Sequence, residues 1–340
     1  MIQQDKPIQN QELLYEENPF RVYEEKVPCY AIAINSDNNL VVAGIGYNIK
    51  VIQITQDQTL KMLQLIKHHQ ELVLCLSFFS KNLRSRSFIS VADTIIIWDE
   101  SDHQWNIQTC LKIEQDISQV KSLVIHPEED LIICGSQQTI QFWFQNLDTE
   151  PNKIQNEWIC KPFENRDTFG LSINQKGDKL VSCNTGQEIL VLEGSNTTEW
   201  KVMEKISTNA YGLRLCFITN DIIAFQERGS RPHEHLQFYS LNSKEKLTQS
   251  NVKGGYQACN SLFPLSYVPS KQLIIDRNGY SVNVVRIKQV NSQQFESELV
   301  QYFEFKSEYI YGTVSKDGNI LIIWNDKLEV IQFRRLNVNI

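Results

Sequence analysis

One short strand pattern recurs along this chain at nearly constant intervals, and each copy ends at a bulky apolar side chain. Subtracting the residue numbers of successive ends gives spacings of 46, 45, 49, 47, 46 and 46 residues. The ends are Ile52, Trp98, Trp143, Leu192, Tyr239, Val285 and Ile331. A strand-rich period near 45 residues is typical of a β-propeller with one four-stranded blade per repeat. Seven periods fill the 340 residues, so the sequence predicts an all-β, seven-bladed β-propeller.

Each period contains the strands that such a blade needs. It begins with an alternating strand and a polar hairpin, as in Tyr30–Ile34 and then Ser36–Asn39. The second strands, such as Leu40–Ala43, are apolar on both faces, as expected where sheets stack on neighbouring sheets. The fourth strands, such as Trp105–Ile107, are more polar because they face solvent. We therefore expect four antiparallel strands in every blade.

The last period is incomplete, because the chain stops nine residues after Ile331 and leaves no room for a fourth strand. The segment Phe20–Val27 has the alternation to supply it. We predict that this N-terminal strand pairs with the last blade and closes the ring, which removes two free sheet edges. Residues 1–19 are rich in Gln, Asn and Glu and are predicted to form a flexible arm. Residues 20–340 are then a single propeller domain.

Composition limits the partners of this domain. The formal net charge of −7 and the sequence pI near 5.5 give no basic field that would attract nucleic acid. Apolar stretches such as Leu72–Leu76 are far shorter than the roughly 20 residues that a membrane helix needs, so no membrane insertion is expected. The N-terminus lacks a basic start followed by an apolar core, so the predicted location is cytoplasmic.

The eight cysteines are scattered through the chain without a C-x-x-C pair. Most of them fall inside predicted strands, where a reduced thiol behaves as a small buried hydrophobe. We therefore expect neither disulfide bonds nor a cysteine metal site. These cysteines are Cys29, Cys75, Cys110, Cys134, Cys160, Cys183, Cys216 and Cys259.

The second period resembles a WD40 repeat. It has a His before its first strand, a Ser in the second strand, an Asp in the following turn and then a Trp-Asp pair. In that family these groups form a buried hydrogen-bond chain from Asp through His and Ser to the Trp indole. The resemblance assigns this chain to Asp93, Ser90, Trp98 and either His69 or His68. The third and fourth periods lack the turn Asp and the preceding His.

The second to fourth periods are also similar to the WD-repeat subunit family of the cytosolic iron–sulfur protein assembly machinery. The similarity is carried by Ser118–Pro127, Glu157–Cys160 and Gly177–Cys183, and it fades in the fifth and sixth periods. It implies a subunit that recruits client proteins without holding the cluster itself. The motifs are partly generic to WD40 repeats, so this remains the alternative to a general scaffold.

The sequence offers little for catalysis. The strongest candidate is the His233-Glu234-His235 stretch, because alternate residues of a strand project to one face and two imidazoles can share a metal. No Cys or further His lies close in sequence, so a solvated loop or a partner contact is the favoured interpretation. A Gly-rich phosphate loop is absent. We expect no enzyme, no metal and no cofactor, and a hydrolase or lyase propeller is the remaining alternative.

A propeller without a catalytic site leaves its rims for binding other proteins. The loops that enter each first strand and those between second and third strands converge on one face. Tyr and Arg are over-represented among the residues that anchor protein interfaces. The sequence therefore predicts a docking face, used within a multiprotein complex, that contains Tyr47, Lys67, Lys121, Arg228, Arg231, His233, Tyr256, Tyr280 and Tyr309.

Overall fold

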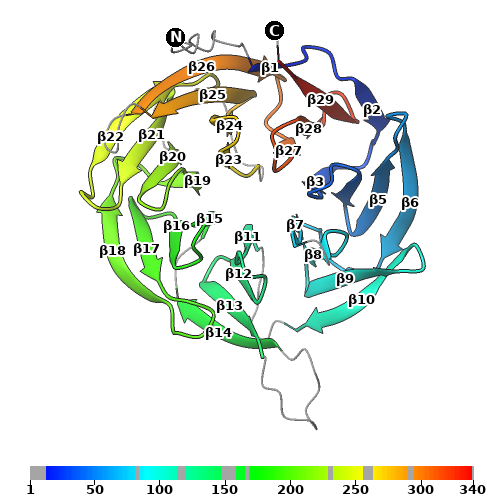
Figure 1. Cartoon of the computed structure of the whole chain (residues 1–340), viewed down its shortest axis with the longest axis horizontal. Coiled ribbons are helices and arrows are strands. Elements are labelled where there is room, and N and C mark those ends of the chain that lie inside the picture. Colours follow the sequence, from blue (N-terminus) through cyan, green and yellow to red (C-terminus); the bar gives the residue numbers. More distant parts are fainter. Residues whose placement is uncertain are drawn as a thin grey trace, which may run out of the picture.

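Seven small sheets stand around a central axis like the blades of a fan (Figure 1). This is seen in the computed structural model, which describes residues 13–81, 84–112, 120–146, 158–164, 168–228, 233–255, 263–289 and 295–338. Every strand pairing is antiparallel, and in six of the seven sheets the neighbours are strands that follow one another in the chain. The prediction of an all-β, seven-bladed propeller is confirmed.

The first strand of each blade lines the centre of the ring, and the second lies behind it (Figure 1). The first strands are β3 (Cys29–Ile34), β7 (Cys75–Phe78), β11 (Ser122–Ile125), β15 (Gly170–Ile173), β19 (Gly212–Phe217), β23 (Ser266–Val268) and β27 (Ile310–Val314). The second strands are β4 (Leu40–Ile45), β8 (Phe88–Val91), β12 (Leu131–Gly135), β16 (Lys179–Cys183), β20 (Ile222–Glu227), β24 (Leu273–Asn278) and β28 (Ile320–Asn325).

The third and fourth strands form the outer half of each blade. The third strands are β5 (Asn48–Ile54), β9 (Ile95–Ser101), β13 (Thr139–Gln145), β17 (Glu188–Glu193), β21 (His235–Ser240), β25 (Ser281–Gln289) and β29 (Val330–Val338). The fourth strands of blades 1 to 6 are β6 (Leu60–Lys67), β10 (Gln104–Leu111), β14 (Trp158–Glu164), β18 (Lys201–Ser207), β22 (Lys246–Asn251) and β26 (Phe295–Glu304). Blades are numbered along the chain, so that β3–β6 form blade 1.

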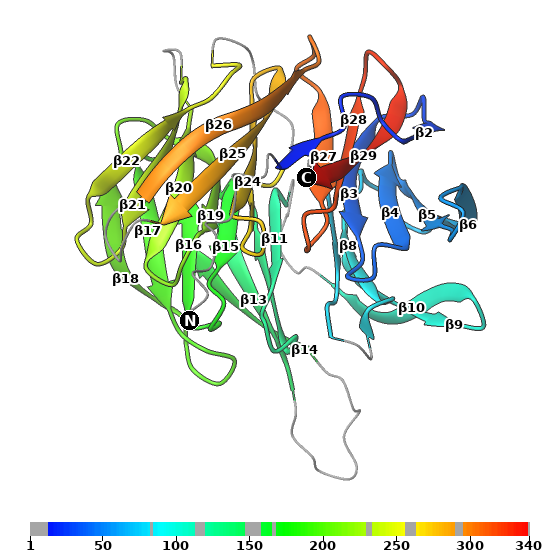
Figure 2. The same cartoon turned by 45° about the horizontal axis from the view of Figure 1, so that its top comes forward.

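The turns between strands divide the surface into two faces (Figure 2). Turns between first and second strands, and between third and fourth strands, lie on what we call the hairpin face. Turns between second and third strands lie at the opposite ends of the sheets, together with the segments that lead into each first strand. We call this second surface the loop face. It is the face that the sequence selects for docking.

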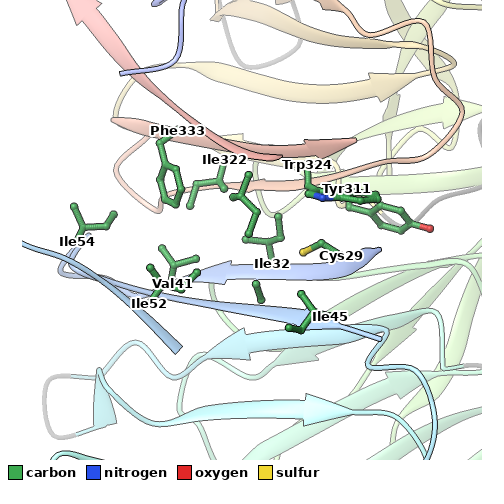
Figure 3. Close-up of a cluster of buried hydrophobic side chains, with 12 residues drawn as sticks. Cys29, Ile32, Val41, Ile45, Ile52, Ile54, Tyr311, Ile322, Trp324 and Phe333 are labelled. Carbon is green, nitrogen blue, oxygen red and sulfur yellow. The ribbon is translucent and has the colours of Figure 1, made fainter. Parts of the chain in front are cut away.

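The core lies between neighbouring sheets rather than inside any one of them. Between blades 7 and 1, for example, Trp324 and Phe333 point from one sheet toward Val41 and Ile52 of the other (Figure 3). All four side chains are buried. Burying an aliphatic or aromatic side chain of this size stabilises the fold by roughly 1.5–3 kcal/mol. Second strands that are apolar on both faces follow from this arrangement, because each sheet packs on two neighbours.

Six of the seven recurring apolar positions have the same role, since each packs against the preceding blade. Trp98 and Trp143, for instance, belong to the clusters between blades 1 and 2 and between blades 2 and 3. The seventh, Ile331, instead packs toward blade 1, which follows blade 7 in the ring. The equivalent residue is Arg334, which pairs with Leu321 as Ile52 pairs with Val41. The predicted recurring position of blade 7 was therefore wrong by three residues. The alignment of the seven repeats required an apolar side chain there, and Arg334 is charged.

The N-terminal segment closes the ring as predicted, although it does so in two pieces. Strand β2 (Arg21–Glu24) pairs with the first half of β29, within the predicted stretch Phe20–Val27. Strand β1 (Leu13–Tyr15) pairs with the last residues of β29. The predicted flexible arm, residues 1–19, includes β1, so Leu13–Tyr15 form a strand where a flexible arm was expected. Residues 1–12 lie outside the described residues.

A repeated contact explains why β1 is held. In blade 2, the backbone of Trp105 exchanges two hydrogen bonds with the side-chain amide of Gln64 from blade 1, with distances of 2.7 and 3.0 Å. In blade 7, the backbone of Tyr15 makes the same pair with Gln301 of blade 6, at 2.8 and 2.7 Å. Gln64 and Gln301 occupy the same register, opposite Val51 and Val284. Tyr15 is thus the outer-strand aromatic residue of blade 7.

Candidate docking surface

The predicted hydrogen-bond chain of blade 2 lies within the described residues. The Trp98 indole N–H donates to Ser90 Oγ over 2.8 Å. The Ser90 Oγ lies 2.7 Å from Nε2 of His69, and Nδ1 of the same ring lies 2.9 Å from Asp93 Oδ1. His69 is therefore the histidine of the chain, whereas the exposed His68 ring only contacts the Trp98 ring. The chain ties the segment before β7 to strands β8 and β9.

The direction of these bonds follows from the donors available. An indole can only donate, so Ser90 Oγ accepts from Trp98 and its own proton goes to Nε2 of His69. The remaining ring proton, on Nδ1, then donates to Asp93. Burial lowers the pKa of His69 even though Asp93 opposes the shift, so the neutral ring that this arrangement requires is favoured at pH 7. The chain fixes the start of blade 2.

In three other blades, the polar group of the residue at the recurring position bonds to a glutamine two residues earlier on the same strand. In blade 5, the Tyr239 hydroxyl donates to Oε1 of Gln237, two residues earlier on the same strand, over 2.8 Å. In blade 3, the Trp143 indole lies 3.2 Å from Oε1 of Gln141. In blade 7, a guanidinium nitrogen of Arg334 donates to Gln332 over 2.9 Å. A Gln-Phe pair precedes the recurring residue in all three blades, and this signal was overlooked in the sequence.

Seven of the nine predicted docking residues fall within the described residues. Each is in a turn or strand end on the loop face, but their exposure differs. Tyr47, Lys67 and Tyr309 are exposed, whereas Lys121, Arg228, His233 and Tyr280 are half-buried. Arg231 and Tyr256 lie outside the described residues. The Lys121 ammonium sits 4.0 Å from the centre of the Phe169 ring, so it is already engaged within the protein.

His233 belongs to a polar joint between blades 5 and 6. Its Nδ1 lies 3.8 Å from Oε2 of Glu227, and its backbone carbonyl accepts a hydrogen bond from Asn278 of blade 6 over 2.6 Å. Burial lowers the pKa of His233, with Arg228 adding to the shift, and burial raises the pKa of Glu227. Both shifts favour the neutral forms. Among the described residues, no three His, Cys, Asp or Glu side chains are grouped as metal ligands would be.

Five of the seven described cysteines are buried, as expected for small hydrophobic side chains. Burial raises the pKa of the Cys75 and Cys183 thiols to about 12, which keeps them protonated and unreactive. Cys110 is exposed on the outer strand β10, and Cys160 on β14 is intermediate. Cys259 lies outside the described residues.

Exposed apolar side chains are distributed unevenly over the described surface. Eleven large hydrophobic side chains are exposed, and seven of them are on outer strands. The other four are on the loop face of blades 7 and 1, and none lies in a described turn of the hairpin face. We call these four residues the apolar patch: Val27, Tyr47, Tyr309 and Leu328. Exposed apolar side chains that gather in one region mark interaction sites more often than scattered ones do.

Hydrogen bonds hold the four residues of the apolar patch near one another. The Gly46 N–H, next to Tyr47, donates to the carbonyl of Pro28, next to Val27, over 3.2 Å. The Glu25 N–H donates to the carbonyl of Glu329, next to Leu328, over 2.8 Å. Ser307, which accepts the Tyr309 N–H, bonds to Asp326 in the turn that carries Leu328. Four separate segments therefore meet on the loop face over blades 7 and 1.

Sequence reasoning found Tyr47 and Tyr309 but missed Val27 and Leu328. Val27 was assigned to the closing strand, yet β2 ends at Glu24. The recurring strand pattern that ends at Ile331 covers residues 327–331 and so includes Leu328, yet the third strand of blade 7 begins at Val330. One signal in the sequence could have identified Leu328. It is the single apolar residue among Asp326, Lys327 and Glu329, and a turn needs no apolar side chain for its own stability.

The hairpin face has a different character, because its polar side chains bond from blade to blade. Contacts of this kind join five neighbouring pairs of blades, from blade 7 through blade 1 to blade 5. They are Asn38–Asp317 at 2.8 Å, Ser85–Asp37 at 3.3 Å, Lys81–Glu128 at 2.8 Å, His126–Gly177 at 3.1 Å and Lys179–Asp221 at 2.8 Å. Surface pairs add little stability individually. They nevertheless occupy the polar groups that a partner would need.

Comparison with known proteins identifies the fold and nothing narrower. No protein family model and no curated protein matches the chain. Among 1439 matching chains of solved structures, one belongs to "Crystal Structure of Mitotic Checkpoint Complex". It is 14% identical with a TM-score of 0.70, and the match covers 98% of this chain and 96% of that chain. At this identity the likeness shows the propeller fold alone, and the iron–sulfur assembly resemblance gains no support.

One further finding concerns membranes. None of the described residues forms a helix with the length and hydropathy needed to cross a bilayer.

Proposed function

We propose that this protein is a non-enzymatic scaffold that binds other proteins through the loop face of its propeller, with the apolar patch over blades 7 and 1 as the centre of the docking surface. The observation that carries the proposal is the placement of Val27, Tyr47, Tyr309 and Leu328 together on this face. Interfaces are commonly built from an apolar centre that contains tyrosine and is surrounded by polar side chains.

The surroundings of the patch fit this role. Lys26, Lys67 and Lys327 are exposed beside it and supply a polar rim. The hairpin face offers a partner fewer polar groups to bind, because side chains of neighbouring hairpins are bonded to one another. The buried thiols, such as those of Cys75 and Cys183, suit a reducing compartment, and we place the scaffold in the cytoplasm within a multiprotein complex.

The test is affinity capture from cells with three forms of the protein, followed by quantitative mass spectrometry. The patch variant carries Tyr47→Ser and Leu328→Ser. The matched control carries Ile159→Ser and Met203→Ser, which remove two apolar side chains of similar exposure from the outer strands. We expect the control to retain the proteins bound by the unmodified chain and the patch variant to lose them. Equal retention by both variants would contradict the proposed docking surface.

A further inference from the structure

The N-terminal segment Leu13–Glu25 contacts three blades. At its start, the Tyr15 side chain is 2% exposed, and its hydroxyl donates to the carbonyl of Gly318 in the first hairpin of blade 7 over 2.7 Å. The Tyr15 backbone also makes the two bonds to Gln301 of blade 6. This end of the segment therefore fastens blade 7 to blade 6 near the hairpin face.

The middle of the segment reaches blade 1. The Arg334 guanidinium donates to the carbonyl of Glu16, and the Arg335 guanidinium lies 4.7 Å from the centre of the Phe20 ring. Arg21 donates to the backbone carbonyl of Gln58, in the turn between the third and fourth strands of blade 1. Between β1 and β2 the segment leaves the β29 ladder for a few residues, so its two strands are separate attachments.

The far end of the segment is fixed by Glu25, which is 3% exposed. Its backbone N–H donates to Glu329, and its carbonyl accepts the Trp324 indole N–H over 2.9 Å. Its carboxylate bonds to Lys50 of blade 1 and accepts the Val27 N–H over 3.1 Å. One buried residue thus joins the closing strand, the core of blade 7, blade 1 and the first member of the apolar patch.

From Glu25 the connection continues into the apolar patch. Val27 lies two residues further along the chain, and the next residue, Pro28, accepts the Gly46 N–H beside Tyr47. The Gly46 carbonyl in turn accepts the Val73 N–H over 3.0 Å. The turn that carries Tyr47 is therefore held by the residues that follow the closing strand.

We propose that the N-terminal segment is a clasp that couples closure of the ring to the shape of the apolar patch. When β2 pairs with β29, Glu25 occupies its buried position and the turns of Val27, Tyr47 and Leu328 are held together. When the clasp leaves β29, the bonds from Glu25 to Glu329 and Trp324 are lost, and the patch separates into independent turns. This inference rests on the proposed function only for its biological use, because the coupling itself is a property of the free protein.

Hydrogen exchange of the intact, unbound chain tests the coupling without any partner. The reporter is the Gly46 amide, whose bond to Pro28 contains no atom of Glu25. In Glu25→Ala, Lys50 loses its buried partner and the end of the clasp is released, so we expect exchange at Gly46 to accelerate by about tenfold or more. In Glu25→Gln, the amide oxygen can still accept the Val27 N–H, so we expect a smaller acceleration.

A matched control separates coupling from general loosening. Glu100→Ala breaks a comparable partly buried pair, between Glu100 and Arg86 in blade 2. We expect this variant to leave exchange at Gly46 unchanged. Unchanged exchange at Gly46 in Glu25→Ala, or equal acceleration in Glu100→Ala, would overturn the proposal. Neither outcome would bear on whether the patch binds a partner, which the capture experiment decides.

Discussion

Two serines at equivalent positions should respond in opposite ways to the same substitution. Ser90 in blade 2 and Ser182 in blade 4 are both fully buried, and each faces the third-strand residue two places before the recurring position. Ser90 accepts the Trp98 indole N–H and donates to His69. The hydroxyl oxygen of Ser182 has no hydrogen-bond partner. Replacement by Ala therefore breaks a network in blade 2 and removes an unsatisfied polar atom in blade 4.

The expected effects can be estimated. Ser90→Ala leaves the Trp98 N–H and His69 Nε2 without partners, and a buried unsatisfied group costs about 1–3 kcal/mol, so the free energy of unfolding should fall by about 2–6 kcal/mol. An unfolding entropy of about 2.1 cal/mol/K per residue over the whole chain gives about 0.7 kcal/mol/K. The Tm should then fall by about 3–8 °C. Ser182→Ala should leave the Tm unchanged or raise it by about 1–2 °C.

Scanning calorimetry of the two purified variants beside the unmodified protein measures the difference. Circular dichroism confirms that each variant keeps its strand content at 20–25 °C. Equal decreases in Tm for Ser90→Ala and Ser182→Ala would refute the reasoning. The loss of stability would then depend on the size and burial of the side chain and not on its hydrogen bonds. A rise in Tm for Ser90→Ala would contradict it as well.

Three more predictions concern stability. Burial raises the pKa of Asp276 from 3.8 to about 6, so the folded state retains its proton more strongly and the free energy of unfolding should fall by about 2 kcal/mol between pH 4 and about pH 6; Asp276→Asn should abolish this decrease in urea titrations across that range. Tyr239→Phe should cost about 1–2 kcal/mol in the same titrations, because Gln237 loses its donor. Deleting residues 1–27 should lower the Tm sharply, and unchanged melting would count against closure by the N-terminal segment.

Much of the fold could be predicted because its information is periodic and local. Counting intervals between apolar strand ends gave the number of blades, and the alternation in Phe20–Val27 identified β2. The hydrogen-bond chain of blade 2 was predicted because Ser90, Asp93 and Trp98 lie close together in sequence. Strand β1 was missed because its three residues are too few for a pattern, and it is held by Gln301 from the far end of the chain.

Features that depend on several blades were harder to predict. Arg334 was not recognised as the seventh recurring residue, because a charge there is tolerated only through its contacts with Gln332, Glu16 and the Phe303 ring. The apolar patch depends on which turns meet after the ring closes, so only two of its four members, Tyr47 and Tyr309, could be predicted. His233 was predicted as a surface contact, whereas it lies in the joint between blades 5 and 6.

Hydrogen exchange of the protein with and without its captured partner tests the docking role most directly. The account predicts slower exchange in the complex for the turns that carry Val27, Tyr47, Tyr309 and Leu328, with little change on the outer strands. Protection confined to the outer strands or to the hairpin face would contradict it.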